Sequence, residues 1–398
     1  MKSSIKYKLL PIIIIGIIAL STVFYLFALQ TQKANLDKVT LDGIQAAKET
    51  FYNLEKNDVK MLEAAMTDFS TNQEYKDIFL ENDRQKLFDF GQALFVEHKA
   101  MGITHFYFHR PDGTVFVRLH DATKYDDVLK RKTFAKAKET KSWGTGIELG
   151  KTAFALRAVK PYYNGNELVG YIEFGEEINH FIDIMKEETG HEYSVVVKKE
   201  FIDPGEWASV TKTKGLRNNY GDLKNYVVID STREYAAKFN KDSFAQQNLD
   251  AVADKGNIFS KFTRGDKTYV SGGFALYDAG NDKVGAVIVT EDVTQLEKTA
   301  TQNNQNVLIT AILAALLIAG IMSLLLVLLI IRPLENVVET TTRVVGGDFS
   351  ARSNVKSKDE IGRLAQMIEG FKTVLINTAK DLEESQKEEA REKVEVHD

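Results

Sequence analysis

Two arginines and a histidine on predicted strands are the residues best suited to bind a small molecule. Arg118 and His120 fall on the alternating segment Thr114–His120, so we expect both on one face, about 7 Å apart. Arg157 lies in a second alternating segment, Ala153–Val159, between apolar neighbours. A guanidinium offers a planar pair of donors that matches a carboxylate. This pattern predicts a small anionic ligand, such as an organic acid.

The same arginines also admit a structural interpretation, in which they form ion pairs inside the fold with Glu148, Glu173 or Asp121. Calorimetry separates the two interpretations, because an anion site binds acids and rejects amines. We expect aromatic side chains to form the walls of the site; the candidates are Trp143, Phe154, Tyr162 and Tyr171.

Histidines near the first strand raise the question of a metal site. His105, His109, His120 and Asp121 cluster in the sequence. His105 and His109 share a strand face but lie about 13 Å apart, which is too far for one ion. The chain has no cysteine, which excludes disulfides, thiolate metal sites and a cysteine nucleophile. No nucleophile–base pair is recognisable, so we expect no metal, no cofactor and no enzymatic activity.

Two long apolar runs bracket the segment that carries these residues. They span Leu9–Leu29 and Val307–Ile331, and each is long enough to cross a bilayer as a helix. A cleavable signal peptide is the alternative for the first run. Its apolar core is longer than such peptides have, and no small-x-small cleavage site follows it. We therefore expect a retained anchor and a two-span membrane protein.

The basic residues that flank the two runs predict the orientation in the membrane. Cations close to span ends stay in the cytoplasm, and here they are Lys2, Lys6, Lys8, Arg332, Arg343, Arg352, Lys356 and Lys358. We expect both termini in the cytoplasm and the intervening loop outside, as in a protein of the bacterial inner membrane. The mild net charge of -5 gives no indication of nucleic-acid binding.

The loop between the runs is expected to contain helices followed by strands. Apolar residues at three-and-four spacing predict helices over 34–66 and 83–100, with a break at 70–72. Turns at Pro111-Asp112-Gly113 and Asn164-Gly165 predict antiparallel hairpins. The predicted strands are 103–109, 114–120, 146–149, 153–159, 168–174, 193–198 and 226–229, with further helices near 128–138 and from about 293.

The loop also repeats itself at an offset of 115 residues. The matching positions are Gly150 and Gly265, Phe154 and Tyr269, Tyr162 and Tyr277, Gly165-Asn166 and Gly280-Asn281, Val169-Gly170 and Val284-Gly285, and Glu176 and Glu291. Each copy consists of a strand, a polar turn, a strand and an acidic exit into a helix. A duplicated sheet module is the simplest explanation.

These segments resemble the double Cache sensor domain, a pair of PAS-like sheets found in bacterial receptors. The most specific parts are 105–120 and 146–177, whereas the second copy lacks counterparts of Arg157 and Pro161. The resemblance implies a small-molecule sensor whose site lies in the first, membrane-distal module. The expected ligand-contacting residues are Phe108, Arg118, His120, Trp143, Glu148, Phe154, Arg157, Tyr162 and Glu173.

A second motif follows the second apolar run directly. Pro333 marks a helix boundary, Gly347-Asp348-Phe349 interrupts the helix, and Asp359-Glu360-Ile361-Gly362 opens another. Both helices carry apolar residues at heptad spacing, which require partners from a second chain. The segment resembles a HAMP domain, the four-helix relay of two-span receptors. The residues expected to carry its signalling role are Pro333, Gly347, Asp348 and Glu360.

No effector domain is recognisable after this segment. The heptad pattern stops after Leu382, and His397 is the only histidine of the tail. Gly346–Phe349 also matches the signature of diguanylate cyclases, but that domain needs far more chain than follows. We expect the output to act in trans, or the chain to be part of a longer receptor.

The predicted fold class is α+β: a two-span membrane protein with tandem PAS-like antiparallel-sheet modules on a long N-terminal helix, then a HAMP parallel coiled coil. The predicted segments are a cytoplasmic N-terminus (1–8), a first span (9–29), an extracytoplasmic sensor (30–306, with modules at about 100–180 and 190–295), a second span (307–331), HAMP (332–382) and a charged helical tail (383–398).

The predicted function is that of a homodimeric signal-transduction receptor. It would bind a small molecule outside the membrane and relay the signal through HAMP to a cytoplasmic kinase, chemoreceptor or other effector, for example in chemotaxis. The alternative is a membrane-anchored regulatory or binding subunit that pairs with a separate kinase or chemoreceptor. Co-purification of such a partner in a fixed ratio would favour the alternative.

Overall fold

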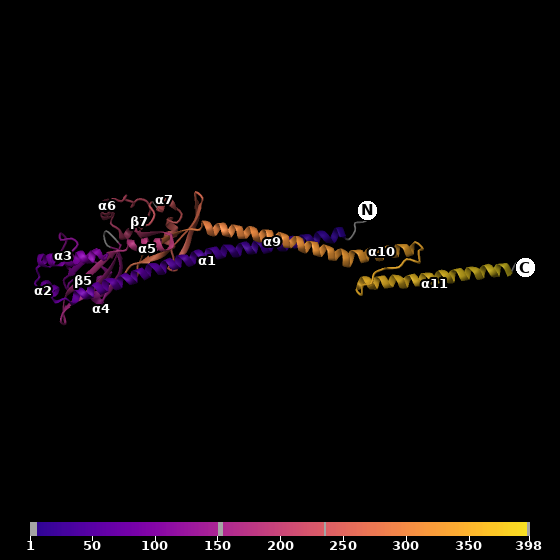
Figure 1. Cartoon of the computed structure of the whole chain (residues 1–398), viewed down its shortest axis with the longest axis horizontal. Coiled ribbons are helices and arrows are strands. Elements are labelled where there is room, and N and C mark those ends of the chain that lie inside the picture. The colour runs from indigo at the N-terminus through magenta and orange to yellow at the C-terminus, as the bar shows by residue number, and fades with distance from the viewer. Residues whose placement is uncertain (1–5, 150–153, 235, 396–398) are drawn as a thin grey trace. The chain divides into compact units, whose positions relative to one another are not determined.

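The computed structural model describes residues 6–149, 154–234 and 236–395. The chain divides into two compact units, one of residues 33–299 and one that combines the residues up to 32 with those from 300 onward. Helices α1 (Lys6–Thr71) and α9 (Thr294–Leu326) each contribute to both units. Figure 1 labels the main elements of each unit.

The first sheet of the 33–299 unit has five antiparallel strands in the order β2-β1-β5-β4-β3. Its strands are β1 His105–His109, β2 Val115–Arg118, β3 Gly144–Leu149, β4 Phe154–Asn164 and β5 Glu167–Glu177. Helices α2 Gln73–Leu80, α3 Arg84–Ala100 and α4 Lys132–Thr140 belong to the same module. Gly165 turns β4 into β5 with a φ of 60°, a conformation that favours glycine.

The second sheet has the equivalent order, β7-β6-β10-β9-β8. Its strands are β6 Glu192–Lys198, β7 Tyr226–Ser231, β8 Asn257–Arg264, β9 Lys267–Tyr277 and β10 Lys283–Asp292. Its helices are α6 Pro204–Thr213, α7 Ala236–Phe239 and α8 Gln246–Asp250, with a 3₁₀ turn at Lys199–Phe201. Helix α5 (Asn179–Thr189) connects the two sheets. The equal strand order confirms the duplication.

The strand pairing corrects one detail of the repeat. In the first sheet Phe174 pairs with Ala158, whereas its counterpart Val289 in the second sheet pairs with Gly272. The offset on β5 and β10 is therefore 115 residues, as expected, but on β4 and β9 it is one residue shorter. The reason is the longer turn before β10, so Phe154 and Tyr269 are not structural equivalents.

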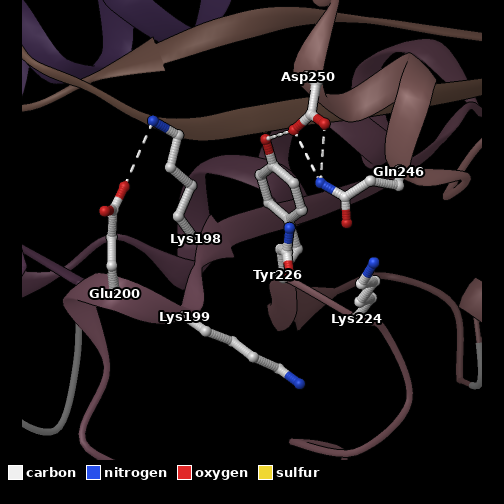
Figure 2. Close-up of a pocket in the computed structure, with 8 residues that line it drawn as sticks. Lys198, Lys199, Glu200, Lys224, Tyr226, Gln246 and Asp250 are labelled. Atoms are coloured by element: carbon white, nitrogen blue, oxygen red, sulfur yellow. Dashed lines mark hydrogen bonds and ion pairs between the residues drawn. The ribbon is translucent and has the colours of Figure 1, made fainter.

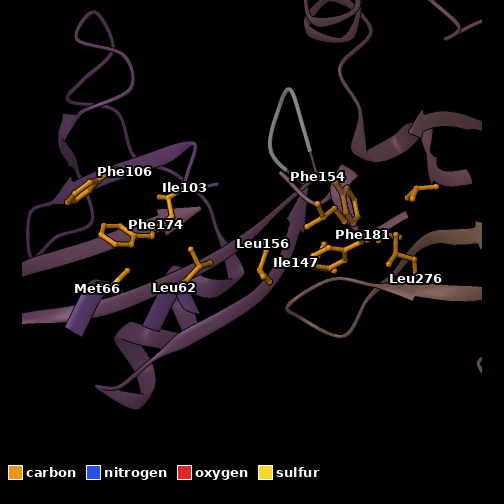
Figure 3. Packing of buried hydrophobic residues seen from close by; sticks show 14 of the residues in the cluster. Leu62, Met66, Ile103, Phe106, Ile147, Phe154, Leu156, Phe174, Phe181 and Leu276 are labelled. Carbon is orange, nitrogen blue, oxygen red and sulfur yellow. The ribbon is translucent and has the colours of Figure 1, made fainter. Parts of the chain in front are cut away.

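Alternation of side chains gives the first sheet an apolar face that packs against α1 and α2. Phe106 and Phe174 meet the ring of Phe69 on α1 at 5.2 and 6.5 Å. Figure 3 shows Phe106 and Phe174 near Leu62 and Met66 of α1, and the side chains of Leu62 and Met66 are fully buried. Burial of each such side chain stabilises the fold by about 1.5–3 kcal/mol.

Helix α1 packs against the second sheet in the same way. Phe51 meets Phe181 of α5 at 5.4 Å and Phe274 of β9 at 6.0 Å. Ile44 lies so close to β9 that a Cβ on Gly272 would be 2.3 Å from its Cδ1 atom. The absence of a side chain at Gly272 therefore permits the close approach of helix and strand.

A β-bulge changes the predicted alternation on β2. The pairing of β1 with β2 shifts between Phe108 and His109. Phe116 is buried and its ring meets Phe79 of α2 at 5.8 Å, whereas simple alternation predicted it on the face of Arg118. A bulge inserts one extra residue into a strand and so breaks the period of two.

Several helix boundaries also differ from the prediction. Helix α1 continues to Thr71, and a further helix, α2, follows at once. The side chain of Asn72 caps α2 by accepting a hydrogen bond from the Glu74 amide at 2.9 Å. Helices α2, α6, α7 and α8 have 4–10 residues each, so apolar spacing alone gives too short a pattern to predict them.

In the other unit, two helices are long and apolar enough to cross a membrane. They correspond to the first part of α1 and to α9. In the most apolar 18-residue stretch of each helix, 0% and 6% of the residues are buried, respectively. Apolar surface of this extent is unfavourable in water, which supports a lipid environment. Pro11 lies near the start of α1, where a missing amide donor is tolerated.

A π-helical turn, Val327–Ile331, joins α9 to α10 (Arg332–Val345). Pro333 has no amide proton, so it cannot donate the α-helical hydrogen bond to the carbonyl four residues earlier. This missing bond accounts for the change of helix type here. A connector then leads to α11 (Glu360–Glu395). Helix α10 holds the connector through Asn336, whose Oδ1 accepts from the Asn354 amide at 3.0 Å.

Candidate ligand-binding site

Three arginines surround the ring of Tyr107 on the second face of the first sheet. The guanidinium carbons of Arg131, Arg118 and Arg157 lie 4.7, 5.4 and 5.7 Å from the ring centroid. Arg118 and Arg157 come from β2 and β4, and Arg131 immediately precedes α4. Direct cross-strand pairing of Tyr107 with Arg118 and Glu173 explains why these side chains share one face.

Glu173 is the central acid of this arginine cluster and is fully buried. Its carboxylate accepts hydrogen bonds from Arg157 Nη1 at 2.7 Å and from His109 Nε2 at 3.0 Å, and it forms an ion pair with Arg131. Burial, and then the nearby Arg131, lowers the pKa of His109 to about 3. His109 is therefore neutral, and its Nε2–H donates to Glu173.

Burial and positive charge also determine the protonation of the groups around Tyr107. Burial lowers the pKa of His105 to about 2 and that of His120 to about 4, with Arg157 as the second cause in both. Burial alone would raise the pKa of Tyr107, but Arg157 and Arg131 outweigh it and lower that pKa. The rings of His105 and His120 lie 4.9 Å apart. Both imidazoles are neutral in a positively charged environment.

Arg118 connects the arginine cluster to a cavity of about 260 Å³. It is 6% exposed and forms two 2.8 Å contacts with the Asp127 carboxylate, which is half exposed. Arg84 and Lys124 also line this cavity, and among its described lining residues none is acidic. Arg84 pairs at 2.6 Å with Asp126, which precedes Asp127 in the 121–127 loop. The cations that line the cavity are therefore each paired with an acid of the 121–127 loop, and Lys124 pairs with Asp121 at 3.3 Å.

The structure brings together about half of the predicted ligand-contacting residues. Arg118, His120, Arg157 and Glu173 belong to the arginine cluster. Glu148 lies on the same face, where its Oε1 accepts from the Thr133 amide at 2.8 Å. The prediction of internal ion pairs is confirmed for Arg157 with Glu173. For Arg118 the partner is Asp127, not one of the predicted acids.

Four predicted residues point to the opposite face and do not join this site. Phe108 packs on Phe79 of α2 at 5.6 Å, and Tyr162 meets the same ring at 5.6 Å. Phe154 belongs to the apolar core, and Trp143 lies under the Lys160 ammonium at 4.9 Å. Side chains alternate along a strand. Phe154 and Tyr162 are therefore on the other side of β4 from Arg157. Tyr171, predicted as a wall, does lie on the face of His109.

Tyr107, Arg131 and Asp127 were missed by the sequence prediction. Tyr107 carries a usable signal, because it alternates with Phe106 and Phe108 and so shares the face of His105 and His109. Arg131 and Asp127 lie outside the predicted strands, in the segment before α4. Such a segment has no period that relates its side chains to a sheet face.

The second sheet carries a separate cavity of about 380 Å³. Figure 2 shows Lys198, Lys199 and Lys224 around it, with Tyr226 donating a 2.8 Å hydrogen bond to Asp250. Glu200 pairs with Lys198 at 3.5 Å. The cations around this cavity are lysines near the protein surface, in contrast to the buried arginines of the first sheet.

The predicted HAMP residues lie at helix ends. Pro333 is the second residue of α10, and Gly347, which has a φ of 95°, is the second residue after the end of that helix. Asp348 accepts hydrogen bonds from the Ser350 hydroxyl and from Arg343 Nη2, both at 2.6 Å, and these two groups, in that order, lower its pKa to about 2. Glu360 begins α11.

Comparison with known proteins identifies two families. Residues 41–296 match the family described as the double sensory domain of two-component sensor kinases. Residues 325–374 match the HAMP domain. The sensor protein SrrB of Staphylococcus aureus is 30% identical over 153 residues, which are 35% of this chain and 26% of that protein. The chain thus spans about a quarter of the length of the curated relatives it matches.

The solved structures that this chain matches are distant in sequence and have low TM-scores. The ligand-binding domain of the Campylobacter jejuni chemoreceptor Tlp3 in complex with L-valine is 9% identical, with a TM-score of 0.37, over 67% of this chain and 96% of that one. The periplasmic domain of Vibrio cholerae LuxQ is 10% identical, with a TM-score of 0.38, over 62% and 98%. The family match over residues 41–296 is decisive: this chain belongs to the double sensory domain family of two-component sensor kinases, and a HAMP domain follows that sensor.

Proposed function

We propose that this protein is a transmembrane receptor that detects a small organic anion outside the bacterial inner membrane and signals through HAMP to a cytoplasmic effector. The family match, the two candidate spans and the HAMP domain support a membrane sensor. The basic residues beside both spans support cytoplasmic termini. The sign of the ligand charge follows from the arginine cluster.

Arg118 is the single observation that carries the choice of an anion. It is almost fully buried, it lines a cavity with two other cations, and its donor fork already holds a carboxylate, that of Asp127. A ligand carboxylate would compete with Asp127 for the same donors. Release of Asp127 would break one of the contacts that hold the 121–127 loop, which gives ligand binding a structural consequence.

The relay requires a second chain. A HAMP domain has four helices, and this chain supplies α10 and α11. Large apolar side chains of α11 remain exposed, including Leu364, Phe371 and Val374 at 37%, 55% and 59%. Their heptad spacing fits a parallel bundle. A homodimer is therefore the proposed assembly. Exclusive recovery with a different receptor or kinase would instead support a regulatory subunit.

Calorimetry on the full chain in nanodiscs tests the ligand charge. The panel contains acetate, lactate and succinate as acids, ethylamine as a cation and glucose as a neutral compound. At least one acid should bind, and Arg118→Met should weaken it at least 10-fold, because a charge-assisted hydrogen bond contributes about 1.5–3 kcal/mol.

Arg217→Met is the matched control. Arg217 also pairs with an aspartate, Asp222, but it lies in the other sheet module, and its side chain is 41% exposed. This variant should bind the acid as the wild type does. Binding of ethylamine without any acid, or equal acid affinity for Arg118→Met and the wild type, would contradict the proposal.

A further inference from the structure

Asp58, Glu176 and His180 form a compact group away from the arginine cluster. Each offers one ligand atom, and the three atoms lie within 4.8 Å of one another. Asp58 belongs to α1, Glu176 to β5 and His180 to α5, and all three lie in the 33–299 unit. Glu176 faces away from Glu173, since positions three apart on a strand point to opposite sides.

One oxygen of the buried Glu176 carboxyl group lacks a hydrogen-bond partner. The residue is 2% exposed, and among the described residues its Oε1 has no hydrogen-bond partner. An unsatisfied buried polar group costs about 1–3 kcal/mol. A second carboxyl group, that of Asp58, lies beside it, and two carboxylates this close repel each other. A cation between them would remove both penalties.

His180 is oriented as metal-binding histidines are. Its Nδ1 lies 3.0 Å from the Glu177 carbonyl oxygen, and its Nε2 lies 2.8 Å from Asp58 Oδ2. Donation of the Nδ1 proton to a backbone carbonyl leaves the Nε2 lone pair for an ion, the arrangement common around protein-bound metals. The side chains of His180 and Asp58 are 42% and 22% exposed, so an ion can enter from solvent.

We propose that Asp58, Glu176 and His180 bind a divalent transition-metal ion of the Zn²⁺ class. One imidazole nitrogen and two carboxylate oxygens match the ligands of three-residue zinc sites, with a fourth position left for water. Ca²⁺ and Mg²⁺ favour six or more oxygen ligands. Bonds of about 2.0–2.2 Å place ligand atoms roughly 3.4 Å apart, so atoms that lie up to 4.8 Å apart need to approach by at most about 1.4 Å.

The second module supplies an internal comparison. Glu291 is the structural equivalent of Glu176, because Leu156 pairs with Glu176 as Val270 pairs with Glu291. Glu291 also lies beside α1, but next to Gly43, whose Cβ position is 3.9 Å from Glu291 Oε2. The position equivalent to His180 is Gln295. The second module thus keeps the acid and lacks the other two ligands.

Occupancy of this site would act on the junction between the modules. The ion would join α1 to α5, and α5 is the segment that connects the two sheets. Binding to the folded state stabilises it in proportion to the logarithm of the free metal concentration. We expect Zn²⁺ to raise the unfolding temperature of the 33–299 unit.

The test uses the full chain in nanodiscs, free of any affinity tag and stripped with a chelator. Titration with ZnCl₂ in a calorimeter should give one equivalent bound per chain. Glu176→Gln, Asp58→Asn and His180→Gln should each weaken this binding at least 10-fold, and Glu291→Gln should not. Co²⁺ should produce visible absorption bands in the wild type that Glu176→Gln lacks.

Unfolding of each metal-free variant separates loss of a ligand from loss of the fold. Glu176→Gln removes the buried carboxyl group that lies beside Asp58, and the variant should be folded and at least as stable as the wild type without metal. Its failure to respond to Zn²⁺ then supports the site. Equal Zn²⁺ stoichiometry and affinity in the wild type and in the variant with all three ligands replaced would overturn the proposal. Loss of binding in Glu291→Gln, or a preference for Ca²⁺ over Zn²⁺, would also overturn it.

Discussion

Glu173→Gln should destabilise the 33–299 unit by about 3–5 kcal/mol, the usual cost of removing one partner from a buried ion pair. Glu173 is 0% exposed and interacts with Arg157, His109 and Arg131. Glutamine keeps the shape of the side chain but not its charge. The guanidinium of Arg157, which is 3% exposed, would then lack its closest counter-ion.

Tryptophan fluorescence measures this loss in the full chain. Trp143 and Trp207 are its only two tryptophans, and both lie in the 33–299 unit. If the free energy of unfolding falls by about 3 kcal/mol per molar urea, the midpoint of Glu173→Gln should fall by about 1–2 M. Glu167→Gln is the control, because Glu167 is exposed at the start of the same strand. Its change should stay within about 0.5 kcal/mol.

A double-mutant cycle with Arg157→Met tests whether the ion pair is the cause. The two residues are in direct contact at 2.7 Å, so their losses should be non-additive by about 1–3 kcal/mol. The double variant should be more stable than the sum of the single losses predicts. Additive losses, or a loss below about 1 kcal/mol for Glu173→Gln, would refute the reasoning.

Three further changes test other parts of the molecule. Burial lowers the pKa of His109 from 6.5 to about 3, so the stability that neutral His109 provides is complete above pH 6.5 and is lost progressively below it. Between pH 6.5 and pH 5, the free energy of unfolding of His109→Gln, measured with urea, should therefore fall by about 2 kcal/mol less than that of the wild type. A Cβ on Gly285 would lie 1.9 Å from the Val196 carbonyl oxygen on β6, so Gly285→Ala should lower the unfolding temperature strongly, whereas Gly221→Ala, in open space, should not. Asp348→Ala removes the acceptor after α10 and should speed amide exchange over residues 347–351 in hydrogen–deuterium exchange.

The duplicated sheets could be predicted because their signals are local. Alternating strands and the Asn164-Gly165 turn each occupy a few consecutive residues, and a constant offset of 115 residues relates Glu176 to Glu291. The two spans follow from length and hydrophobicity alone. The one-residue shift between β4 and β9 could not be predicted, because it depends on which residues pair across the sheet after a longer turn.

The site was predicted only in part, for two different reasons. Phe154 and Tyr162 are at even positions of β4 and Arg157 is at an odd one, so they lie on opposite faces. The sequence alone was therefore enough to exclude those two residues from the site. The pairing of Arg118 with Asp127 gave no such signal, because a loop has no period. The same holds for Asp58 and His180, which lie 122 positions apart and meet only through tertiary packing.

The structural comparison of the two modules indicates a division of roles. With the shifted register, Arg157 corresponds to Ser271 and Glu173 to Ile288. Ile288 lies in an apolar cluster with Val196, and the Ser271 hydroxyl donates to the Val289 carbonyl at 3.1 Å. At these two positions the second sheet therefore has a hydroxyl and an apolar side chain where the first sheet has the Arg157–Glu173 ion pair. Duplication preserved the strand order, while the Arg157–Glu173 ion pair has no counterpart in the second copy. We infer that discrimination of ligand charge belongs to the first module, and that the second, which leads directly into α9, serves the connection to the membrane span.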